Sequence, residues 1–260
     1  YASGPFVLAS SVLGIPTALW EPNAHPGMTN RMLARFVRKT FLVFDESRKY
    51  MKSKRFEVLG LPVREEIEKL NQAEPKRGDD KVFKILVFGG SQGARAINNC
   101  VASMIKEFTL EGVEVVHQTG PYDFQSVKTN YGDQQSNVKV MEYLYDIEKY
   151  YLWADLVICR AGAGTIAELA AAKKPSILIP LPTAADDHQK KNAVSLMNKN
   201  AARLIEQKDL TPGVLFNLIG ELRSQPGLMK KMSENVQHFY QPQAAKKIAE
   251  KLINLQFDNE

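Results

Sequence analysis

The sequence has few cysteines, no long apolar run and only a small excess of positive charge. With two cysteines in 260 residues, neither a disulfide framework nor a zinc-ligand spacing can be built, so a reducing compartment is the default. No apolar run reaches the roughly 18–20 residues needed to cross a bilayer. The net charge of +5 suits an anionic ligand or membrane surface. Because aromatic and basic residues are not interleaved, we expect no nucleic acid partner.

The composition is that of a folded globular chain. Hydrophobic residues make up 44% of the chain and charged residues 24%, which is enough for one large domain or two modest ones. The chain begins at Tyr1 rather than Met, and its first stretch, YASGPFVLASSVLGIP, reads as the interior of a domain. We therefore expect this chain to be N-terminally truncated.

Strand and helix patterns alternate along most of the sequence. Strands are expected at 17–20, 41–44, 57–59, 84–88, 113–117, 138–142, 156–159, 176–179 and 203–205. Helices are expected at 5–13, 28–39, 94–108, 122–131, 146–153, 163–173, 188–199 and from 211 onward, with two more in 225–255 that separate at Pro242. Five strands are near-continuous runs of Val, Ile and Leu, as in strands buried on both faces. The alternation predicts an α/β fold with doubly wound parallel sheets.

Two further segments have a distinctive pattern. The predicted helix 28–39 is amphipathic, with Leu33, Phe36 and Val37 on one side and three arginines on the other. The polar segment 71–81, NQAEPKRGDDK, is expected to be a surface loop or linker.

The first unusual loop is GGSQGAR, which follows the apolar strand 84–88. Ligands of open parallel sheets bind at the carboxyl ends of the strands, so the residues there are the informative ones. The loop has neither the Lys-Ser/Thr pair of a P-loop nor the spacing of a dinucleotide-binding fold. It can still hold a phosphate on the N–H groups of the following helix, with a hydroxyl from Ser91, but a tight turn that serves only packing fits equally well. The candidate phosphate loop comprises Gly89, Gly90, Ser91, Gln92 and Gly93.

The second loop is CRAGAGTIAELAAA, which follows the strand 156–159. From Ala161 to Gly164 there is almost no side-chain bulk, so a bulky ligand group can approach the backbone. Glu168, in the following helix, can accept hydrogen bonds from a vicinal diol such as a ribose, although a carboxylate that merely complements the helix dipole fits as well. Cys159 is expected to be a small core residue because no base is placed beside it.

The third loop is PLPTAADDHQKKNA, which follows the strand 176–179. Gln189 and Asn192 share a face at the start of the next helix, as amides that read sugar hydroxyls would, while a helix cap by Asp187 is the alternative. Adjacent residues rarely chelate one ion, so Asp-Asp-His in this loop does not predict a metal. Three such loops on one edge of a sheet together indicate a site for a nucleotide diphosphate that carries polar groups.

In combination these motifs resemble those of the MurG family of peptidoglycan glycosyltransferases. The likeness is carried by GGSQGAR, CRAGAGTIAELAAAKKP and DDHQKKNA, and it extends to SGP, LGIPTALWEPNAHPGMTNRMLA and GLPVRE, almost the whole chain. It implies a GT-B fold, in which two doubly wound Rossmann-like domains face each other across a cleft, the first being only partly present here. It also implies an inverting transfer of N-acetylglucosamine from UDP-N-acetylglucosamine to lipid I, which gives lipid II.

The resemblance also implies roles for individual residues. Ser91 would contact the diphosphate, the backbone of Leu144 would meet the uracil, and Glu168 would bind the ribose. Gln189 and Asn192 would read hydroxyls of the N-acetylglucosamine. The full set of donor- or substrate-binding positions is Asn23, Arg64, Ser91, Leu144, Ala163, Gly164, Thr165, Ile166, Ala167, Glu168, Gln189 and Asn192.

The sequence also departs from the family pattern. Pro22 stands where Gln is frequent, Gly164 where a larger residue is common, and Lys173-Lys174 where a Gly is usual. The family's Gly-rich loop ending in His is absent from this sequence, so we expect on the order of 100 preceding residues. The general base is expected in that segment, and no catalytic residue is assigned. No DxD-type metal motif is present, and neither a metal nor a cofactor is expected.

The resemblance divides the chain into four segments. Residues 1–62 would be the remnant of the N-terminal acceptor- and membrane-side domain, and 63–82 the interdomain linker and loop. Residues 83–225 would form the C-terminal donor-binding domain, and the helices of 226–260 would pack back on the N-terminal domain.

The expected location is the cytoplasmic face of the bacterial plasma membrane, as a peripheral protein. The segment 31–55 holds nine Lys or Arg against Asp45 and Glu46, so with Leu33 and Phe36 nearby it can approach anionic lipid. A solvated basic face fits the same composition. Proteins of cell-wall synthesis and division are further expected partners.

Two alternatives of different kinds remain. One is another GT-B enzyme that uses a UDP-sugar, such as an epimerase or an antibiotic glycosyltransferase, although EPNAHPGMTN argues against it. The other is a non-catalytic module that binds a UDP-sugar without transferring the sugar, which would also suit a truncated and inactive chain.

Overall fold

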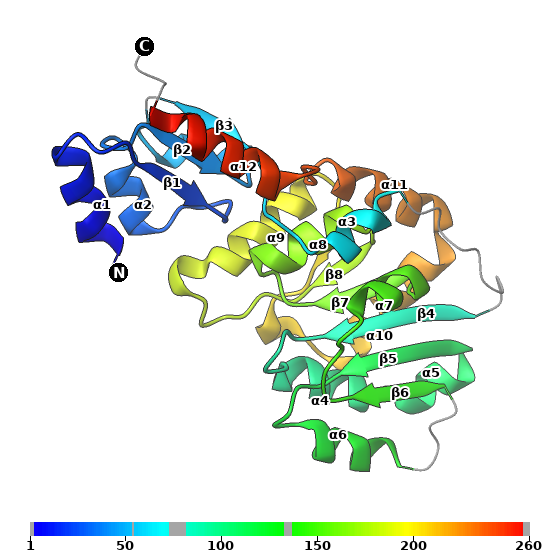
Figure 1. Cartoon of the computed structure of the whole chain (residues 1–260). Coiled ribbons are helices and arrows are strands. Elements are labelled where there is room, and N and C mark those ends of the chain that lie inside the picture. Colours follow the sequence, from blue (N-terminus) through cyan, green and yellow to red (C-terminus); the bar gives the residue numbers. More distant parts are fainter. Residues whose placement is uncertain (1–2, 54, 73–81, 133–136, 257–260) are drawn as a thin grey trace.

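The computed structural model describes residues 3–53, 55–72, 82–132 and 137–256, and it shows two parallel sheets of different size (Figure 1). The first sheet has the order β1 (Ala18–Glu21), β2 (Lys39–Leu42), β3 (Phe56–Val58). The second has the order β6 (Val138–Met141), β5 (Val113–Gln118), β4 (Phe83–Phe88), β7 (Leu156–Cys159), β8 (Ser176–Leu178), β9 (Arg203–Leu204). The neighbouring strands are parallel, so the predicted α/β fold with parallel sheets is confirmed.

Helices connect the strands and cover both faces of the larger sheet. They are α1 (Ser3–Val12), α2 (Met28–Leu33), α3 (Glu65–Leu70), α4 (Arg95–Ala102), α5 (Ile105–Leu110), α6 (Phe124–Tyr131), α7 (Ile147–Trp153), α8 (Ala163–Ala171), α9 (His188–Asn198), α10 (Pro212–Ser224), α11 (Pro226–Gln237) and α12 (Ala244–Ile253).

The central strand β4 shows why the apolar runs have no polar alternation. Ile85 and Val87 point into the core formed with α4, α6 and α10, whereas Leu86 and Phe88 point into the core formed with α7 and α8. Because helices cover both faces of the strand, neither face meets solvent, and the side chains on both faces are apolar. The chain runs outward from β4 through β5 to β6 and then crosses to β7, on the other side of β4. The strand order therefore reverses between β4 and β7, which is where open α/β sheets bind ligands.

Two predicted helices differ from the structure. The helix expected at 28–39 ends at Leu33, because the Arg38 N–H donates to the Thr17 carbonyl and Lys39 already belongs to β2. Of the residues expected on its apolar side, Leu33 and Val37 are buried, whereas Phe36 is 42% exposed. The helix expected at 94–108 is two helices, α4 and α5. Most of the predicted loop 71–81 lies outside the described residues.

The break between α4 and α5 has a local cause. The Ser103 hydroxyl donates to the Cys100 carbonyl at 2.7 Å, a side-chain bond of the kind that competes with the helical ladder.

The two C-terminal helices pack against different parts of the chain. α12 lies against the first sheet, where Lys251 forms a 2.8 Å ion pair with Glu57 and the Leu255 carbonyl accepts from Arg38. In contrast, α11 packs against α8 and α10. The expectation that all of 226–260 packs on the first domain is therefore wrong for α11, because Met232 and Val236 of this helix belong to the cores of the larger sheet.

Candidate functional site

Two predicted loops meet at the point where the strand order reverses. Phe88, the last residue of β4, pairs with Cys159, the last residue of β7, so the loops that follow these two strands are neighbours. Within the described residues, neither α4 nor α8, the helices that begin at these loops, has a side-chain hydrogen bond at its N-cap. Because no side chain occupies them, the N–H groups of these first turns can donate to an acceptor from outside the chain, such as a phosphate.

Glycine is required at different positions of the first loop for different reasons. Gly93 has φ +77°, and a Cβ there would lie 1.8 Å from the Thr119 carbonyl oxygen, so this position is a close backbone crossing. A Cβ on Gly89 would likewise collide with the start of α4. Gly90 has φ +92° but open space around it, so its backbone conformation alone favours glycine. Packing thus explains two glycines, while Ser91 remains exposed in the same turn.

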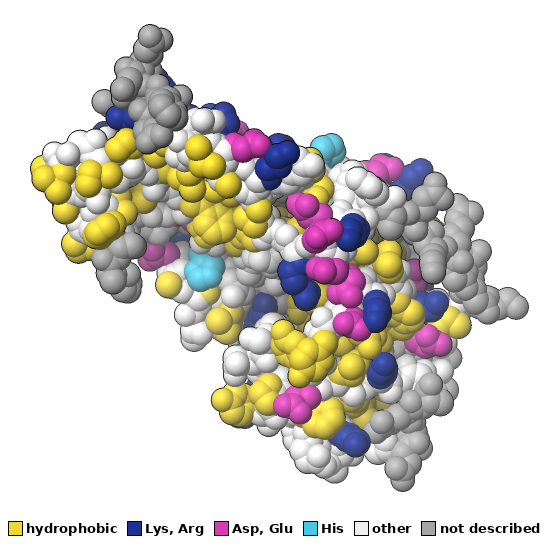
Figure 2. Space-filling model, in the orientation of Figure 1, with side chains coloured by type: hydrophobic (Ala, Val, Ile, Leu, Met, Phe, Trp, Pro, Cys, Tyr) yellow, Lys and Arg dark blue, Asp and Glu magenta, His cyan; other side chains and the backbone are white. Residues whose placement is uncertain are grey.

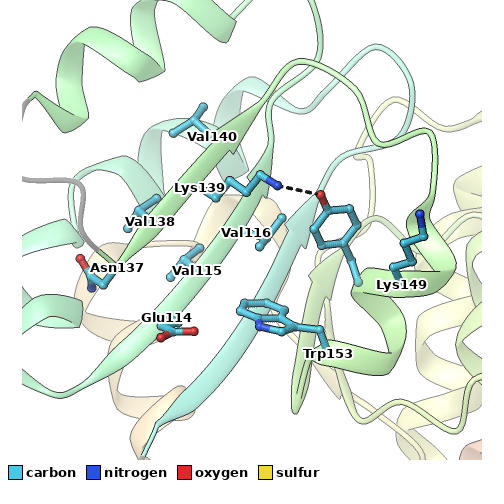
Figure 3. A pocket seen from close by; sticks show the side chains of 10 residues that line it. Glu114, Val115, Val116, Asn137, Val138, Lys139, Val140, Lys149 and Trp153 are labelled. Carbon is cyan, nitrogen blue, oxygen red and sulfur yellow. Dashed lines mark hydrogen bonds between the residues drawn. The ribbon is translucent and has the colours of Figure 1, made fainter. Parts of the chain in front are cut away.

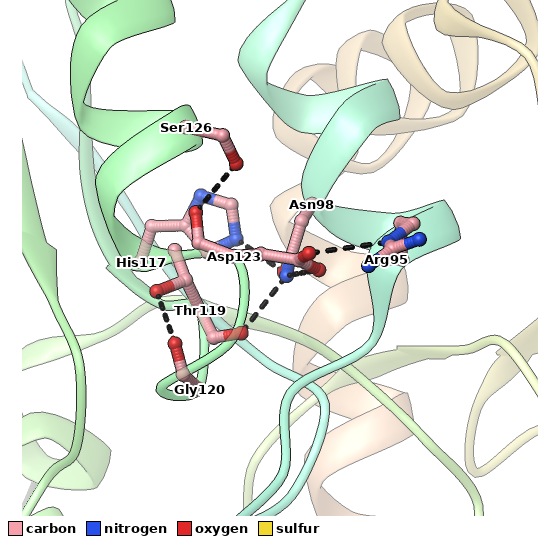
Figure 4. Close-up of polar contacts among 7 residues, drawn as sticks. All are labelled: Arg95, Asn98, His117, Thr119, Gly120, Asp123 and Ser126. Atoms are coloured by element: carbon pink, nitrogen blue, oxygen red, sulfur yellow. Dashed lines mark hydrogen bonds and ion pairs between the residues drawn. The ribbon is translucent and has the colours of Figure 1, made fainter.

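A buried chain of polar side chains supports this loop from the β5 side (Figure 4). Asn98 Nδ2 donates to the Thr119 carbonyl and to Asp123 Oδ2, both at 2.9 Å, so Asn98 Oδ1 must act as an acceptor. His117 Nε2 lies 3.0 Å from that Oδ1 and carries the proton, while the Tyr131 hydroxyl donates to His117 Nδ1 at 2.7 Å. Burial lowers the pKa of His117 to about 3, so the imidazole is neutral.

This chain of hydrogen bonds ends at a cation beside the glycine loop. Asp123 Oδ1 accepts from Arg95 Nε at 3.2 Å (Figure 4). The Arg95 side chain is 77% exposed and belongs to the first residue of α4. Arg95 is part of the GGSQGAR motif, but the sequence did not lead us to predict a role for it. Its position directly after the glycines was the available indication.

Glu168 lies in a partly buried cluster formed by three separate elements. Its Oε2 accepts from the Tyr151 hydroxyl of α7 at 3.0 Å. Burial raises the pKa of Glu168, while the Tyr151 hydrogen bond and the charge of Arg64 oppose that rise. Arg64 is the N-cap residue of α3, so the structure brings together two predicted site residues that are far apart in the sequence.

The other predicted residues of α8 and the uracil loop lie around this cluster. Gly164 is exposed on the first turn of α8, beside Ala163 and Thr165, which are half-buried. Ile166 and Ala167 are buried, so they can offer only backbone to a ligand. Leu144, between β6 and α7, is also buried, as its predicted backbone contact with uracil allows.

Gln189 and Asn192, the predicted sugar-reading amides, have different surroundings. Gln189 Oε1 accepts from the Leu181 N–H at 3.0 Å, which closes the loop after β8 and leaves the amide nitrogen for other partners. Asn192 is fully buried. Its predicted role is therefore restricted by its position, since a sugar could reach it only if the surrounding contacts opened.

Asn192 joins the two halves of the chain. Its Oδ1 accepts from the Ala24 N–H at 2.8 Å, and its Nδ2 donates to Asn23 Oδ1 at 3.1 Å and to the Ala161 carbonyl at 3.3 Å. Asn23 and Ala24 belong to the loop after β1, whereas Ala161 belongs to the small-residue loop after β7. We call these contacts the Asn192 clasp.

Two charged residues that sequence reasoning did not select organise the site loops. Glu21 is buried and accepts hydrogen bonds from the N–H groups of Asn23 and Gly27 and from the amides of Asn23 and Asn30. It thereby folds the loop that carries the clasp. Arg160 donates to the carbonyls after β8 and, at 2.7 Å, to Gln207. In the sequence, both residues could have been recognised as charged residues at the end of an apolar strand.

Two of the hollows in the described part of the chain are larger than 400 Å³. One, of about 780 Å³, covers the face of β5 and β6 beside Trp153 (Figure 3) and contains none of the predicted site residues. The other, of about 450 Å³, lies between α9 and the part of the chain that contains the first sheet, which we call the first unit. His25 Nδ1 and Glu46 Oε2, from two residues that line this second hollow, are buried and have no hydrogen-bond partner among the described residues.

Comparison with known proteins gives the same assignment for the whole chain. The model of the glycosyltransferase family 28 C-terminal domain matches residues 84–252. A Bdellovibrio bacteriovorus protein is 48% identical over 97% of this chain and 70% of its own length. A Myxococcus xanthus protein is 40% identical over 98% of this chain and 67% of its own. Both are named UDP-N-acetylglucosamine–N-acetylmuramyl-(pentapeptide) pyrophosphoryl-undecaprenol N-acetylglucosamine transferase.

Solved structures agree with this assignment. The crystal structure of Acinetobacter baumannii MurG superposes with a TM-score of 0.81 at 32% identity and covers 98% of this chain and 71% of that one. A Neisseria meningitidis UDP-GlcNAc 2-epimerase superposes with a TM-score of 0.63 over 95% of this chain and 72% of its own, and its 16% identity shows a shared fold alone. The chain therefore belongs to the MurG family of glycosyltransferases, within glycosyltransferase family 28.

Proposed function

We propose that this chain is a hexosyltransferase that moves N-acetylglucosamine from UDP-N-acetylglucosamine to N-acetylmuramyl-(pentapeptide) pyrophosphoryl-undecaprenol, lipid I, and so forms lipid II of peptidoglycan. The observation that carries the proposal is 48% identity, over 97% of the chain, to a protein named as that transferase. The two uncapped helix N-termini at the strand-order reversal supply the anion-binding geometry that such a donor requires.

In the proposed reaction a hydroxyl of the acceptor attacks the anomeric carbon, the configuration inverts, and UDP leaves. Negative charge then develops on the diphosphate. The N–H groups of α4 and α8, the Ser91 hydroxyl and the Arg95 cation are arranged to stabilise it. We assign no general base to the described residues.

The proposed donor contacts extend outward from the diphosphate. Glu168 accepts from the ribose hydroxyls, and the backbone at Leu144 meets the uracil. The amide nitrogen of Gln189 reads a hydroxyl of the sugar, because its oxygen is already bonded to Leu181. Arg64 supports the site through the charge of Glu168.

A transfer assay tests the proposed function. The chain is incubated with radiolabelled UDP-N-acetylglucosamine and lipid I in detergent, and labelled lipid II is the expected product. Binding of UDP-N-acetylglucosamine without transfer would favour the alternative of a non-catalytic UDP-sugar module. If calorimetry detected no binding at all, both interpretations would be wrong.

We also propose a peripheral contact with anionic lipid at the cytoplasmic face of the plasma membrane. Hydrophobic side chains gather on the first unit (Figure 2), where Phe6, Val12 and Leu13 of α1 and its end are at least 75% exposed. Arg35 lies over the Phe36 ring at 4.7 Å, so a cation borders this surface. In the described part of the chain no helix is both long and apolar enough to cross a bilayer. Sedimentation with liposomes that is independent of anionic lipid would contradict the proposal.

Partners among the proteins of cell-wall synthesis and division remain a proposal that rests on family membership alone. Co-purification of the chain with membrane-bound cell-wall enzymes after crosslinking would test it.

A further inference from the structure

Tyr151 is a buried hydroxyl group that the proposed mechanism has not used. It lies on α7, and its side chain is fully buried between β4 and α8. Its ring meets the Phe88 ring edge-on, with centroids 6.2 Å apart, at the end of the strand that leads into the glycine loop. Its hydroxyl donates to Glu168 Oε2 at 3.0 Å. Packing thus fixes the ring, and the hydroxyl has a single direction in which to point.

The hydrogen bond leaves the two oxygens of Glu168 in different states. Oε2 is engaged by Tyr151. Oε1 has no hydrogen bond to any described residue, and it is not one of the buried unpaired atoms, so it contacts solvent. A carboxylate held at one oxygen and open at the other can present the free oxygen to a ligand in one orientation.

From this geometry we infer that Tyr151 is a positioning residue, which holds the Glu168 carboxylate so that its free oxygen accepts from the ribose hydroxyls of the nucleotide. The inference rests on the proposed binding of a UDP donor at this site. It adds specificity for a ribose diol, because a vicinal pair of hydroxyls matches a carboxylate oxygen fixed in place. It assigns Tyr151 no direct contact with the ligand.

The buried position of Glu168 gives Tyr151 a second effect on the same carboxylate. Burial raises the pKa of Glu168, and the hydrogen bond from Tyr151 and the charge of Arg64 counteract this. Without the hydroxyl the pKa of Glu168 would rise further, so the carboxylate would lose its charge, and its affinity for a diol donor, at a higher pH.

The test compares UDP with 2′,3′-dideoxy-UDP, which keeps the uracil and the diphosphate but lacks both hydroxyls. Calorimetry measures the dissociation constant of each with the wild-type chain and with Tyr151→Phe. We expect Tyr151→Phe to weaken UDP binding about tenfold, as the loss of a hydrogen bond to a charged group implies. Binding of dideoxy-UDP should change less than about twofold, within the scatter of such comparisons.

The chain offers a matched control in the adjacent residue. Tyr150 is on the same helix, but its hydroxyl contacts Lys139 and Met141 of β6 rather than Glu168. Tyr150→Phe should leave the ratio of the two dissociation constants unchanged. Glu168→Gln should remove the preference for UDP, and adding Tyr151→Phe to it should have no further effect on that preference.

The outcomes distinguish a failure of the inference about Tyr151 from a failure of the proposed UDP binding. If wild type binds UDP and dideoxy-UDP equally, Glu168 does not bind the ribose and the inference fails with that role, while UDP binding itself still stands. If wild type prefers UDP and Tyr151→Phe keeps the whole preference, the inference alone is wrong. Should Tyr151→Phe fail to fold, p-fluorophenylalanine at position 151 fills the volume of the hydroxyl without donating, and the same loss is expected. A shift of the pH dependence of UDP binding to higher pH would distinguish positioning from a general loss of stability.

Discussion

Replacing Asn192 by Ala distinguishes a structural clasp from a sugar-reading amide. Its side chain makes three hydrogen bonds, at 2.8, 3.1 and 3.3 Å, to Ala24, Asn23 and Ala161. Each is worth about 1 kcal/mol net, and the buried Ala24 N–H is left unpaired in the variant. We therefore expect Asn192→Ala to lower the free energy of unfolding by about 3 kcal/mol.

The two tryptophans of the chain make the assay specific for each half. Trp20 lies on β1 in the first sheet, and Trp153 ends α7 beside the second. Urea unfolding followed by fluorescence in single-tryptophan variants, Trp20→Phe and Trp153→Phe, reports each half separately. With Asn192→Ala we expect the midpoint reported by Trp20 to fall more than that reported by Trp153, because the smaller unit loses its attachment.

The control and the refuting result come from the same helix. Asn198 is exposed on α9, so Asn198→Ala should change the free energy of unfolding by less than about 0.5 kcal/mol. If Asn192→Ala left stability unchanged but weakened UDP-N-acetylglucosamine binding and not UDP binding, Asn192 would read the sugar. The argument from its hydrogen bonds would then be refuted.

Three further predictions concern the buried network, the glycine loop and the cysteines. Burial lowers the pKa of His117 to about 3, so on acidification the unfolded chain binds a proton at this residue before the folded chain does. The contribution of His117 to the free energy of unfolding is therefore fully present above about pH 6.5, and it should fall by about 3 kcal/mol by pH 4.5. In urea titrations at several pH values, the free energy of unfolding of His117→Gln should depend less on pH than that of the wild type. An identical pH dependence would contradict the prediction. Gly93→Ala should destabilise by more than 2 kcal/mol and abolish UDP binding, whereas Gly90→Ala, in open space at φ +92°, should cost about 1 kcal/mol; equal losses in a thermal melt would argue against the close crossing. Because burial raises the pKa of Cys100 to about 11 and that of Cys159 further, both thiols should react with Ellman's reagent at pH 8 only when the chain unfolds, and fast reaction of the native chain would exclude this.

The sequence determined the order and type of most elements because their signals are local. Val, Ile and Leu runs such as 84–88 and 156–159 identify strands buried on both faces, and the small residues after them identify turns at the sheet edge. The ends of helices were less predictable. α2 stops at Leu33 since the following residues are needed for pairing with β1, a contact between segments that no local pattern expresses.

Individual roles within the site were decided only by tertiary structure. The sequence placed Glu168 and the glycine loop at one edge, but the partner of Glu168, Tyr151, comes from another helix and has no motif of its own. Similarly, Asn192 has the pattern of an exposed sugar-reading amide, yet it is buried between two units whose contact depends on the fold of the Glu21 loop. Local patterns fix which residues form a strand, a turn or a helix. Which side chains meet across them depends on how distant segments pack, and only the folded chain determines that.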